Sequence, residues 1–183
     1  MAIPELVLRT PRLCLVAATL EHIDAELRDR AELQRLLGAS VPDDWPPGEY
    51  DHDAQEFFRS LLNSQGAALH GWLNWYAVTR RAEGTRTALV AGAGFFGAPS
   101  GGVVEIGYSV VESARGRGFA TEIVAALVAH ALSHAHVTEV VAHTSDANVA
   151  STRTLLRCGF ARVGPGTEPQ SVKYRIGTPP RTG

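Results

Sequence analysis

A turn with two glycines and two arginines lies just past the middle of the chain, in the segment ESARGRGFATEI from Glu112 to Ile123. Gly116 and Gly118 allow successive backbone N–H groups to turn inward without obstruction by a Cβ atom. The segment after the turn reads as a helix, whose positive end adds to the charges of Arg115 and Arg117. The pattern predicts a site for a doubly negative group such as a pyrophosphate. The alternative is a solvated turn that simply precedes a helix.

Two other phosphate-binding patterns do not fit. A Walker loop would need GKS or GKT, and neither occurs in the chain. The segment GAGFFG, from Gly92 to Gly97, matches GxGxxG, but the turn-rich APSGG follows it where a dinucleotide site needs a helix. These glycines instead indicate a strand end, a bulge or a closely approached backbone.

The composition suits one globular domain. The chain has 183 residues, is 45% hydrophobic and carries a formal net charge of −2, which argues against a nucleic-acid partner that needs a broad basic surface. No metal site is expected, because the two cysteines lack ligand spacing and His130 and His134 have no accompanying carboxylate. The N-terminal segment lacks the pattern of a signal peptide, and the longest apolar run is too short to cross a bilayer. We therefore expect a cytoplasmic protein with no membrane partner.

The hydrophobic pattern predicts the elements that position the glycine turn. Residues 5–18 read as a strand or hairpin, in which Leu13 and Leu15 alternate with Arg12 and Cys14. Thr19 caps a helix through about Asp29, and the helical pattern continues to Gly38. After a proline-rich loop, Asp53 and Glu56 suggest a capping box for a helix over 54–63, with a stripe of Phe57 and Leu61 that Phe58 and Leu62 may extend. Three strands follow, at 71–80, 85–97 and 102–111, and their short separators predict antiparallel neighbours.

The remaining pattern is a helix over 120–135, a strand at 137–144, a helix over 148–158 and two last strands at 160–164 and 171–177. The order predicts a mixed α/β domain over residues 1–177 with one central sheet, and residues 178–183 read as a loose tail.

Two motifs resemble a known family. IGYSVVESARGRGFATE resembles the acetyl-CoA-binding motif of the GNAT N-acetyltransferases, Q/R-x-x-G-x-G/A, with Arg115, Gly118 and Ala120 in its fixed places. NVASTRTLLRCGF, from Asn148 to Phe160, is similar to the second signature of the branch that acetylates ribosomal-protein N-termini. The resemblance spans nearly the whole chain. It implies a mostly antiparallel sheet with a splayed parallel strand pair and helices on both faces.

The resemblance also implies acetyl-CoA as cosubstrate. Pantetheine would contact the end of the strand at Ser109, Val110 and Val111, with the Val110 N–H donating to the acetyl carbonyl. The pyrophosphate would meet the turn through Arg115, Gly116, Arg117, Gly118, Phe119 and Ala120, with the Thr121 hydroxyl beside them. Asn148 would contact the pantetheine arm or a water; simple helix capping is the alternative.

The chain departs from the family pattern at one of the catalytic groups that the resemblance implies. Many family members have a tyrosine one turn beyond Ser151 that protonates the departing thiolate, but Leu155 stands there, so Ser151 or water would serve. Glu105 is the candidate base that takes the amine proton through water, and an exposed strand residue is the alternative. Glu122, in the first turn of a helix, is expected to stabilise that helix.

The acceptor site is expected in the loop PDDWPPGEY. Asp44, with Asp43 and Glu49, would attract a cationic amine, and Trp45 would pack on its stem. A solvated acidic loop is the alternative. Trp72, Trp75 and Tyr76 are read as core or cleft wall.

The sequence thus predicts direct acetyl transfer from acetyl-CoA to a primary amine, at a peptide N-terminus or on a small molecule, by a protein that the resemblance allows to be a homodimer. The leading alternative is a non-catalytic acyl-CoA sensor of the same fold. A nucleotide-binding oxidoreductase is a third and weaker alternative.

Overall fold

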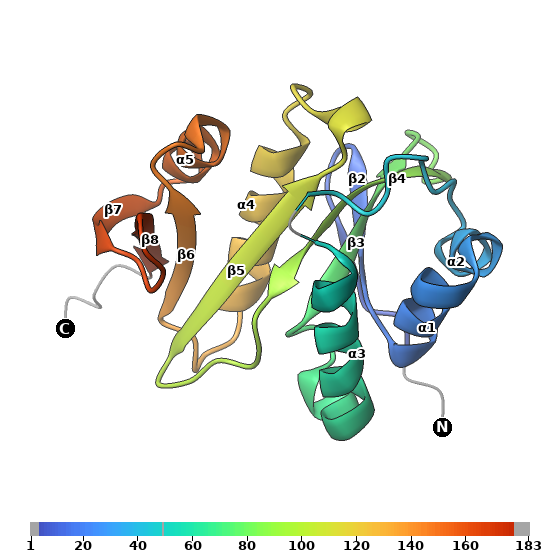
Figure 1. Ribbon diagram of the computed structural model, residues 1–183, viewed down its shortest axis with the longest axis horizontal. Coiled ribbons are helices and arrows are strands. Elements are labelled where there is room, and N and C mark those ends of the chain that lie inside the picture. Colours follow the sequence, from blue (N-terminus) through green and yellow to red (C-terminus); the bar gives the residue numbers. More distant parts are fainter. Residues whose placement is uncertain (1–3, 49, 178–183) are drawn as a thin grey trace.

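One eight-stranded sheet runs through the molecule in the order β1-β2-β3-β4-β5-β6-β8-β7 (Figure 1). The computed structural model describes residues 4–48 and 50–177, so the C-terminal tail expected over 178–183 lies outside the described residues. The strands are β1 Val7–Arg9, β2 Leu13–Ala17, β3 Asn74–Arg80, β4 Arg86–Phe95, β5 Val103–Val110, β6 Glu139–Ser145, β7 Ala161–Pro165 and β8 Ser171–Gly177. Neighbours in this sheet are antiparallel except β5 and β6, which are parallel.

Helices cover both faces of the sheet (Figure 1). The helices α1 Leu20–Arg28, α2 Arg30–Leu37 and α3 His52–Gln65 contribute to one buried core, with side chains such as Ile23, Leu33 and Phe58. The helices α4 Phe119–Leu132 and α5 Val149–Arg157 contribute to the other, with side chains such as Leu127 and Leu155. Two 3₁₀ turns complete the elements, η1 Gly66–Leu69 and η2 Glu112–Ala114. The mixed α/β sheet predicted from the sequence is confirmed.

Short polar residues set the boundaries of the first helices. The Thr19 side chain accepts from the backbone of His22, whose ring reaches back to the Thr19 backbone, so α1 starts at a capping box. Asp29 ends α1 and caps α2, because its carboxylate accepts from the N–H groups of Ala31 and Glu32. Gly38 ends α2 in the left-handed conformation, as expected. The helical pattern that runs from Thr19 to Gly38 is therefore two helices.

Three local expectations are wrong. The N-cap of α3 is Asp51, whose carboxylate accepts from the Ala54 N–H at 3.0 Å, and Asp53 lies inside the helix. Phe57 is 51% exposed, and Phe58 and Leu62 carry the buried stripe because they face the sheet.

The third correction concerns β2, where the sequence suggests alternation between apolar and polar positions. All five residues of β2 are buried, because a helical layer covers each face of this strand.

The segment that imitates a dinucleotide motif is a strand with a close backbone contact. A Cβ atom on Gly94 of β4 would lie 2.0 Å from the carbonyl oxygen of Leu73, which only glycine avoids. The closely approached backbone predicted from the sequence is thus confirmed.

The two parallel strands separate partway along their length. β5 pairs with β6 from Val103 to Ile106, opposite Glu139 to Ala142. Beyond that point β5 continues to Val110 paired with β4, and β6 continues to Ser145 paired with β8. Figure 1 shows β5 and β6 diverging toward α5 and the turn that follows β5. The splayed pair implied by the family resemblance is present.

Among residues 4–48 and 50–177, no helix is both long enough and apolar enough to cross a membrane.

Candidate functional site

The opening between β5 and β6 presents unpaired backbone groups. The Val111 N–H bonds to the Val90 oxygen on β4 at 2.9 Å. Because successive residues of a strand direct their backbone groups to opposite edges, the Val110 N–H faces the opening toward β6. Val110 also ends β5, where the strands are already apart. A donor placed in this way can bind the oxygen of an acyl group held between the strands.

The glycine turn lies at the wide end of this opening. Gly116 and Gly118 have φ values of +74° and +78°, and Gly118 is the N-cap of α4. In the part of the chain that the structure describes, no side chain caps α4, so there the N–H groups of its first turn have no side-chain acceptor. Arg115 and Arg117 are exposed on the turn, and Arg115 Nε donates to the Val110 oxygen at 3.2 Å. The predicted turn residues thus gather at one helix N-terminus beside the end of β5.

Phe119, Ala120 and Thr121 form the first turn of α4. The Phe119 side chain is 3% exposed and belongs to the core, and the guanidinium groups of Arg12 and Arg117 each lie 4.9 Å from its ring centre. Ala120 and Thr121 are half-buried. Only the backbone of Phe119 remains available to a ligand.

Arg12 braces the glycine turn from the β1–β2 connection. Its Nη1 donates to the Arg117 carbonyl at 2.8 Å. Its Nε donates to Glu122 Oε2 at 2.7 Å, and its backbone N–H donates to Glu122 Oε1 at 2.8 Å. The Thr10 hydroxyl also donates to Glu122. Burial alone would raise the pKa of Glu122, but these hydrogen bonds from Thr10 and Arg12 outweigh it and lower the pKa.

Glu105 lies where the two parallel strands begin to separate. His143 Nδ1 of β6 donates to Glu105 Oε1 at 2.8 Å, so the carboxylate is oriented across the gap between the strands. The Glu105 side chain is 36% exposed and the His143 side chain 13% exposed. His143 Nε2 is buried and has no hydrogen-bond partner among the described residues. Glu105 is therefore held in position by the imidazole while its side chain stays partly exposed.

Asn148 and Ser151 lie at the start of α5. The Asn148 carbonyl oxygen accepts from the Ser151 N–H at 3.0 Å, so Asn148 caps this helix. The Ser151 hydroxyl lies 2.8 Å from the hydroxyl of Tyr108 on β5. Two side-chain contacts thus cross between β5 and the β6–α5 segment, Glu105–His143 and Tyr108–Ser151. Because side chains alternate along a strand, Glu105 and Tyr108 lie on opposite faces of β5.

The loop after α2 is bonded to the segment between β5 and the glycine turn. Asp44 accepts from the Ser113 N–H at 2.8 Å and from the Ser113 hydroxyl at 3.1 Å, and the backbone bond is the main cause that lowers its pKa. A Cβ atom on Gly48 would lie 3.1 Å from the Ser109 hydroxyl. The carboxylate of Asp44 is thus already engaged by the segment after β5. Glu49 lies outside the described residues.

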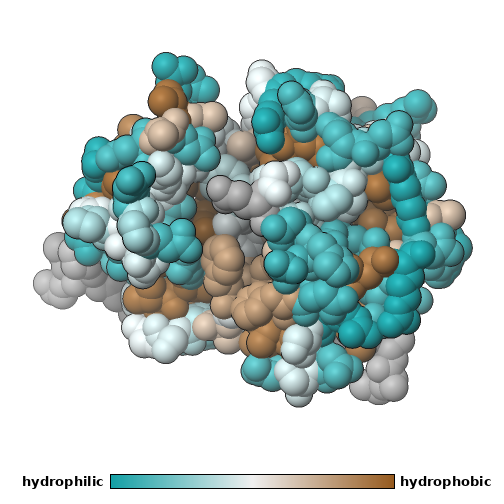
Figure 2. Space-filling model, viewed as in Figure 1, coloured by the Kyte–Doolittle hydropathy of each residue, from teal (hydrophilic) through white to brown (hydrophobic). Residues whose placement is uncertain are grey.

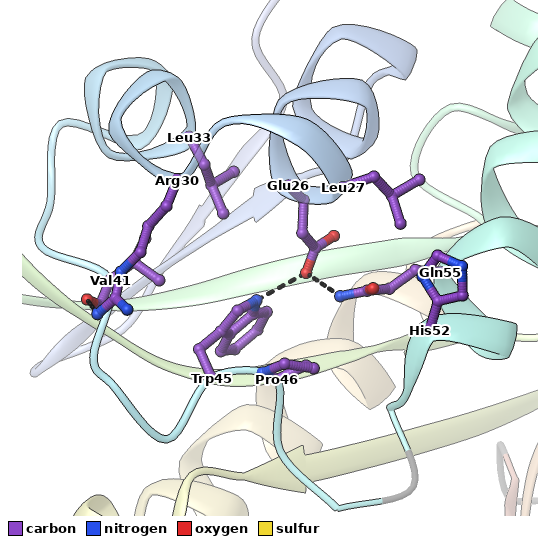
Figure 3. Close-up of a pocket in the computed structure, with 9 residues that line it drawn as sticks. All are labelled: Glu26, Leu27, Arg30, Leu33, Val41, Trp45, Pro46, His52 and Gln55. Carbon is purple, nitrogen blue, oxygen red and sulfur yellow. Dashed lines mark hydrogen bonds between the residues drawn. The ribbon is translucent and has the colours of Figure 1, made fainter.

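Trp45 of the same loop faces the first helices. Its Nε1 donates to Glu26 Oε1 at 2.8 Å, and its ring approaches Gly92 of β4. Trp45 and Pro46 border a pocket of about 160 Å³ beneath α1 and α2 (Figure 3). The same view shows Leu27, Leu33 and Val41 on its walls and Glu26 pointing toward Trp45 and Gln55.

Glu26 is a buried carboxylate with four donors. Besides Trp45, it accepts from the hydroxyls of Tyr50 and Tyr76, at 2.8 and 2.6 Å, and from the Gln55 amide at 2.9 Å. Burial raises the pKa of Glu26, and the four hydrogen bonds offset this only in part. Four donors fill the acceptor capacity of a carboxylate. Glu26 therefore holds the loop in place and has no lone pair left for a cationic amine.

Apolar surface occupies the middle of the face seen in Figure 2, between more hydrophilic regions on either side. Phe96 is 55% exposed, and its ring packs over Gly107 of β5. A Cβ atom on Gly107 would lie only 2.9 Å from that ring. Gly107 is on the same face of β5 as Glu105 and Ser109. The side of the opening that carries Glu105 is thus bordered by an exposed aromatic ring.

Two aromatic side chains expected in the core or cleft wall are fully buried, Trp75 and Tyr76. Trp72 packs against the rings of His130, His134 and His136 in tilted and edge-on arrangements, at ring-centre distances of 5.6, 4.8 and 6.3 Å. Within the described ranges, no group of three or more histidine, cysteine or acidic residues is arranged to hold a metal ion.

Sequence reasoning missed His143, Tyr108, Glu26 and Arg12. Each acts through a partner more than 20 positions away, except for the contact of Glu26 with Trp45, which is 19 positions away. Strand alternation could have placed Tyr108 opposite Glu105. Nothing local distinguishes Glu26 from the other acidic residues of α1.

The chain is similar to known acetyltransferases in sequence. Residues 12–161 match the family described as "Acetyltransferase (GNAT) domain". The Bacillus subtilis (strain 168) protein named "Uncharacterized N-acetyltransferase YjdG" is 29% identical over 154 residues, which are 84% of this chain and 88% of that protein.

Solved structures share the fold at lower identity. A putative ribosomal-protein-serine acetyltransferase from Vibrio cholerae has a TM-score of 0.64 and 18% identity, over 97% of this chain and 100% of that one. The ribosomal alpha-N-protein acetyltransferase RimL in complex with coenzyme A has a TM-score of 0.63 and 22% identity, over 94% and 98%. The microcin self-immunity acetyltransferase MccE in complex with acetyl-CoA and AMP has a TM-score of 0.61 and 14% identity, over 92% and 94%.

Proposed function

The chain belongs to the GNAT acetyltransferase family and is an N-acetyltransferase, and from this premise we propose that it moves the acetyl group of acetyl-CoA directly to a primary amine. The observation that carries the proposal is the opening between β5 and β6, which ends at an uncapped helix N-terminus with two exposed arginines. The proposal assigns the diphosphate of acetyl-CoA to this N-terminus and its thioester to the opening.

The residues present fit that cosubstrate. Nothing lies within 4 Å of a Cβ position on Gly116, so the turn leaves room for a diphosphate against the N–H groups of Gly116 to Thr121. Val110 presents its backbone edge to the opening, where it can pair with an amide-containing arm. Ser109 and Val111 flank it, but the Val111 N–H is bonded to β4 and its side chain is buried, so the contact predicted for Val111 is limited to its place beside Val110. Asn148 caps α5 by accepting from the Ser151 N–H. We therefore assign Asn148 the role of holding Ser151 in place, and not a direct contact with the ligand.

The transfer itself needs a donor, a base and an acid. The Val110 N–H donates to the thioester carbonyl oxygen as the amine attacks, an effect worth about 3 kcal/mol at comparable sites. Glu105 takes the amine proton through a water on one face of β5. Ser151 gives a proton to the departing sulfur on the other face. No acyl-enzyme is required, since the amine attacks the thioester directly.

The acceptor is proposed to be a peptide N-terminus or a small-molecule amine. Two of the structures that share the fold are named for ribosomal proteins and one for self-immunity to a microcin. In this chain the loop with Asp44 and Trp45 and the exposed Phe96 border the Glu105 side of the opening. We place the acceptor amine on that side. Because Asp44 is already bonded to Ser113, we propose that it fixes the position of the loop. We propose that Trp45 forms part of the wall of the acceptor site.

A non-catalytic acyl-CoA sensor is the competing function. Leu155 at the position of the usual tyrosine favours it. The Glu105–His143 pair favours the enzyme, because a ligand-binding module has no use for an oriented carboxylate beside the thioester position.

The test has two measurements. Calorimetry of the full chain should show that acetyl-CoA binds, and a thiol assay should show coenzyme A release with a peptide bearing an N-terminal serine or with a small amine such as spermidine. Binding without thiol release across such a panel would favour the sensor. Absence of binding would contradict both.

A Gly118→Val variant tests the location of the site. Valine at φ +78° strains the turn and crowds the helix N-terminus, so acetyl-CoA affinity should fall by roughly a hundredfold or more. Gly101→Val is the matched control, since Gly101 has φ +58° in the β4–β5 connection. Equal affinities of the two variants would place the diphosphate elsewhere.

A further inference from the structure

Tyr108 carries a hydroxyl beside the opening between β5 and β6 that has no part in the proposed transfer. It lies on β5 between Gly107 and Ser109, in the part of the strand that no longer pairs with β6. Its hydroxyl lies 2.8 Å from the Ser151 hydroxyl and 3.4 Å from the Ser151 carbonyl oxygen on α5. The contact therefore spans the opening from one wall to the other, at the strand end that carries Val110.

The two contacts across the opening have different chemistry. On one face Glu105 and His143 supply an acceptor for protons. On the other face Tyr108 and Ser151 supply only hydroxyls, which can donate. An acetyl transfer releases a proton from the amine and needs one at the sulfur, so the two faces match the two requirements.

We propose that Tyr108 is a positioning residue that holds the Ser151 hydroxyl toward the leaving sulfur and replaces the proton that Ser151 gives up. The inference rests on the proposed function, in which Ser151 serves the leaving group. Leu155, one helical turn beyond Ser151, has no proton to give to the leaving sulfur. The inference assigns the supply of that proton to Tyr108 on β5, acting through Ser151.

The proton balance is complete. The C–N bond forms as the C–S bond breaks, and the sulfur leaves with the electron pair of that bond. It takes the proton of Ser151, which takes the proton of Tyr108, and the tyrosinate then regains a proton from solvent. The proton of the amine leaves separately through Glu105.

The surroundings of Tyr108 keep its hydroxyl protonated. Burial raises the pKa of Tyr108, so the phenol is fully protonated at neutral pH. A phenol that donates to the Ser151 oxygen also makes the serine hydroxyl a better donor, because linked hydrogen bonds polarise one another. Ser151 is already fixed at the capped start of α5, so only its hydroxyl rotor remains to be set.

The experiment uses the full chain and follows thiol release from acetyl-CoA in a single turnover, with a peptide bearing an N-terminal serine. Tyr108→Phe keeps the ring and removes the hydroxyl. We expect the transfer rate to fall by at least about tenfold while the dissociation constant for acetyl-CoA stays within twofold. Tyr174→Phe is the matched control, since the buried Tyr174 hydroxyl lies 3.4 Å from Thr152 on the same helix. It should keep the wild-type rate.

A double-mutant cycle separates the relay from packing. If Tyr108 acts through Ser151, then Tyr108→Phe combined with Ser151→Ala should be no slower than Ser151→Ala alone. Losses that multiply would overturn the inference, as would a Tyr108→Phe rate above half of wild type. A loss of acetyl-CoA affinity equal to the loss of rate would also overturn it, because that result belongs to packing. Absence of thiol release by the wild-type protein would contradict the proposed function and this inference with it.

Discussion

Glu105 shows how a single side chain changes its meaning when its neighbours are known. In the sequence it is a strand carboxylate whose alternatives are a base and an exposed surface residue. In the structure His143 Nδ1 lies 2.8 Å from one of its oxygens, and the side chain is 36% exposed. The carboxylate is thus fixed by a partner on the neighbouring strand, as a base that must act through one water has to be.

Replacing Glu105 by glutamine tests its role as base. The amide oxygen can still accept from His143, so the geometry is kept while the proton acceptor is lost. We expect the acetyl-transfer rate to fall roughly a hundredfold, with acetyl-CoA affinity unchanged. Glu139→Gln is the control, because Glu139 lies on β6 at the closed end of the strand pair and pairs with Arg175. A Glu105→Gln enzyme with more than a third of the wild-type rate would remove Glu105 from the mechanism.

At the scale of elements, the N-terminus of α4 depends on the β1–β2 connection. Glu122 in the first turn of α4 accepts from the Thr10 hydroxyl and from the N–H and guanidinium of Arg12. The same guanidinium donates to the Arg117 carbonyl of the glycine turn. The expected role of Glu122, helix stabilisation, therefore extends to a contact between elements that are 110 positions apart.

A Glu122→Gln variant tests this brace. The amide nitrogen of the glutamine would face Arg12 Nε. One hydrogen bond is then lost, and two N–H donors point at each other. We expect the free energy of unfolding to fall by about 1–2 kcal/mol and acetyl-CoA affinity to fall severalfold. Denaturant titration and calorimetry measure the two effects. Glu32→Gln, in the exposed pair with Arg35, should change neither, and an unchanged Glu122→Gln protein would show that the brace is unnecessary.

Elements were easier to predict than contacts. Hydrophobic period and turn residues located the strands and helices, because those signals lie within a dozen positions. The position of the glycine turn at a helix N-terminus could be predicted because the signal is contained in six residues. The pairs Glu105–His143 and Tyr108–Ser151 join residues 38 and 43 positions apart, and only the sheet topology brings them together. The burial of β2 has the same origin, since packing against both helical layers decided it. The start of α3 was misplaced for a local reason, because Asp51 and Asp53 are both possible caps and Asp51 is the one used.

At the scale of the whole molecule, Glu26 links the parts that border the acceptor side. Its four donors come from the loop after α2, from α3 and from β3, and Glu26 itself belongs to α1. Tyr50 also accepts from the Asn74 amide at 2.9 Å and packs against Gly92, which pairs with Ser109 of β5. Tyr50 therefore connects the hydrogen bonds of Glu26, through Gly92 of β4, to β5, the strand that carries the proposed thioester site.

The protonation of Glu26 should be visible in the stability of the whole protein. Burial raises its folded-state pKa above the ordinary value of 4.5, so the folded state binds its proton more tightly than the unfolded state. The contribution of this proton to stability is therefore complete below pH 4.5 and is lost as the pH rises through the raised folded pKa. Glu26→Gln has no such proton to lose.

We thus expect the stability of the wild type, relative to Glu26→Gln, to decrease as the pH rises from about 4.5. Urea titrations of both proteins at half-unit steps from pH 4.5 to pH 8 measure the difference. Glu83→Gln, in the exposed β3–β4 connection, should follow the wild type at every pH. A difference that grows with pH would mean that the four hydrogen bonds outweigh burial and that Glu26 is ionised in the fold. In that case the network would hold the acceptor side of the molecule by charge, and the Glu26→Gln protein should lose most at neutral pH, where the enzyme is proposed to act.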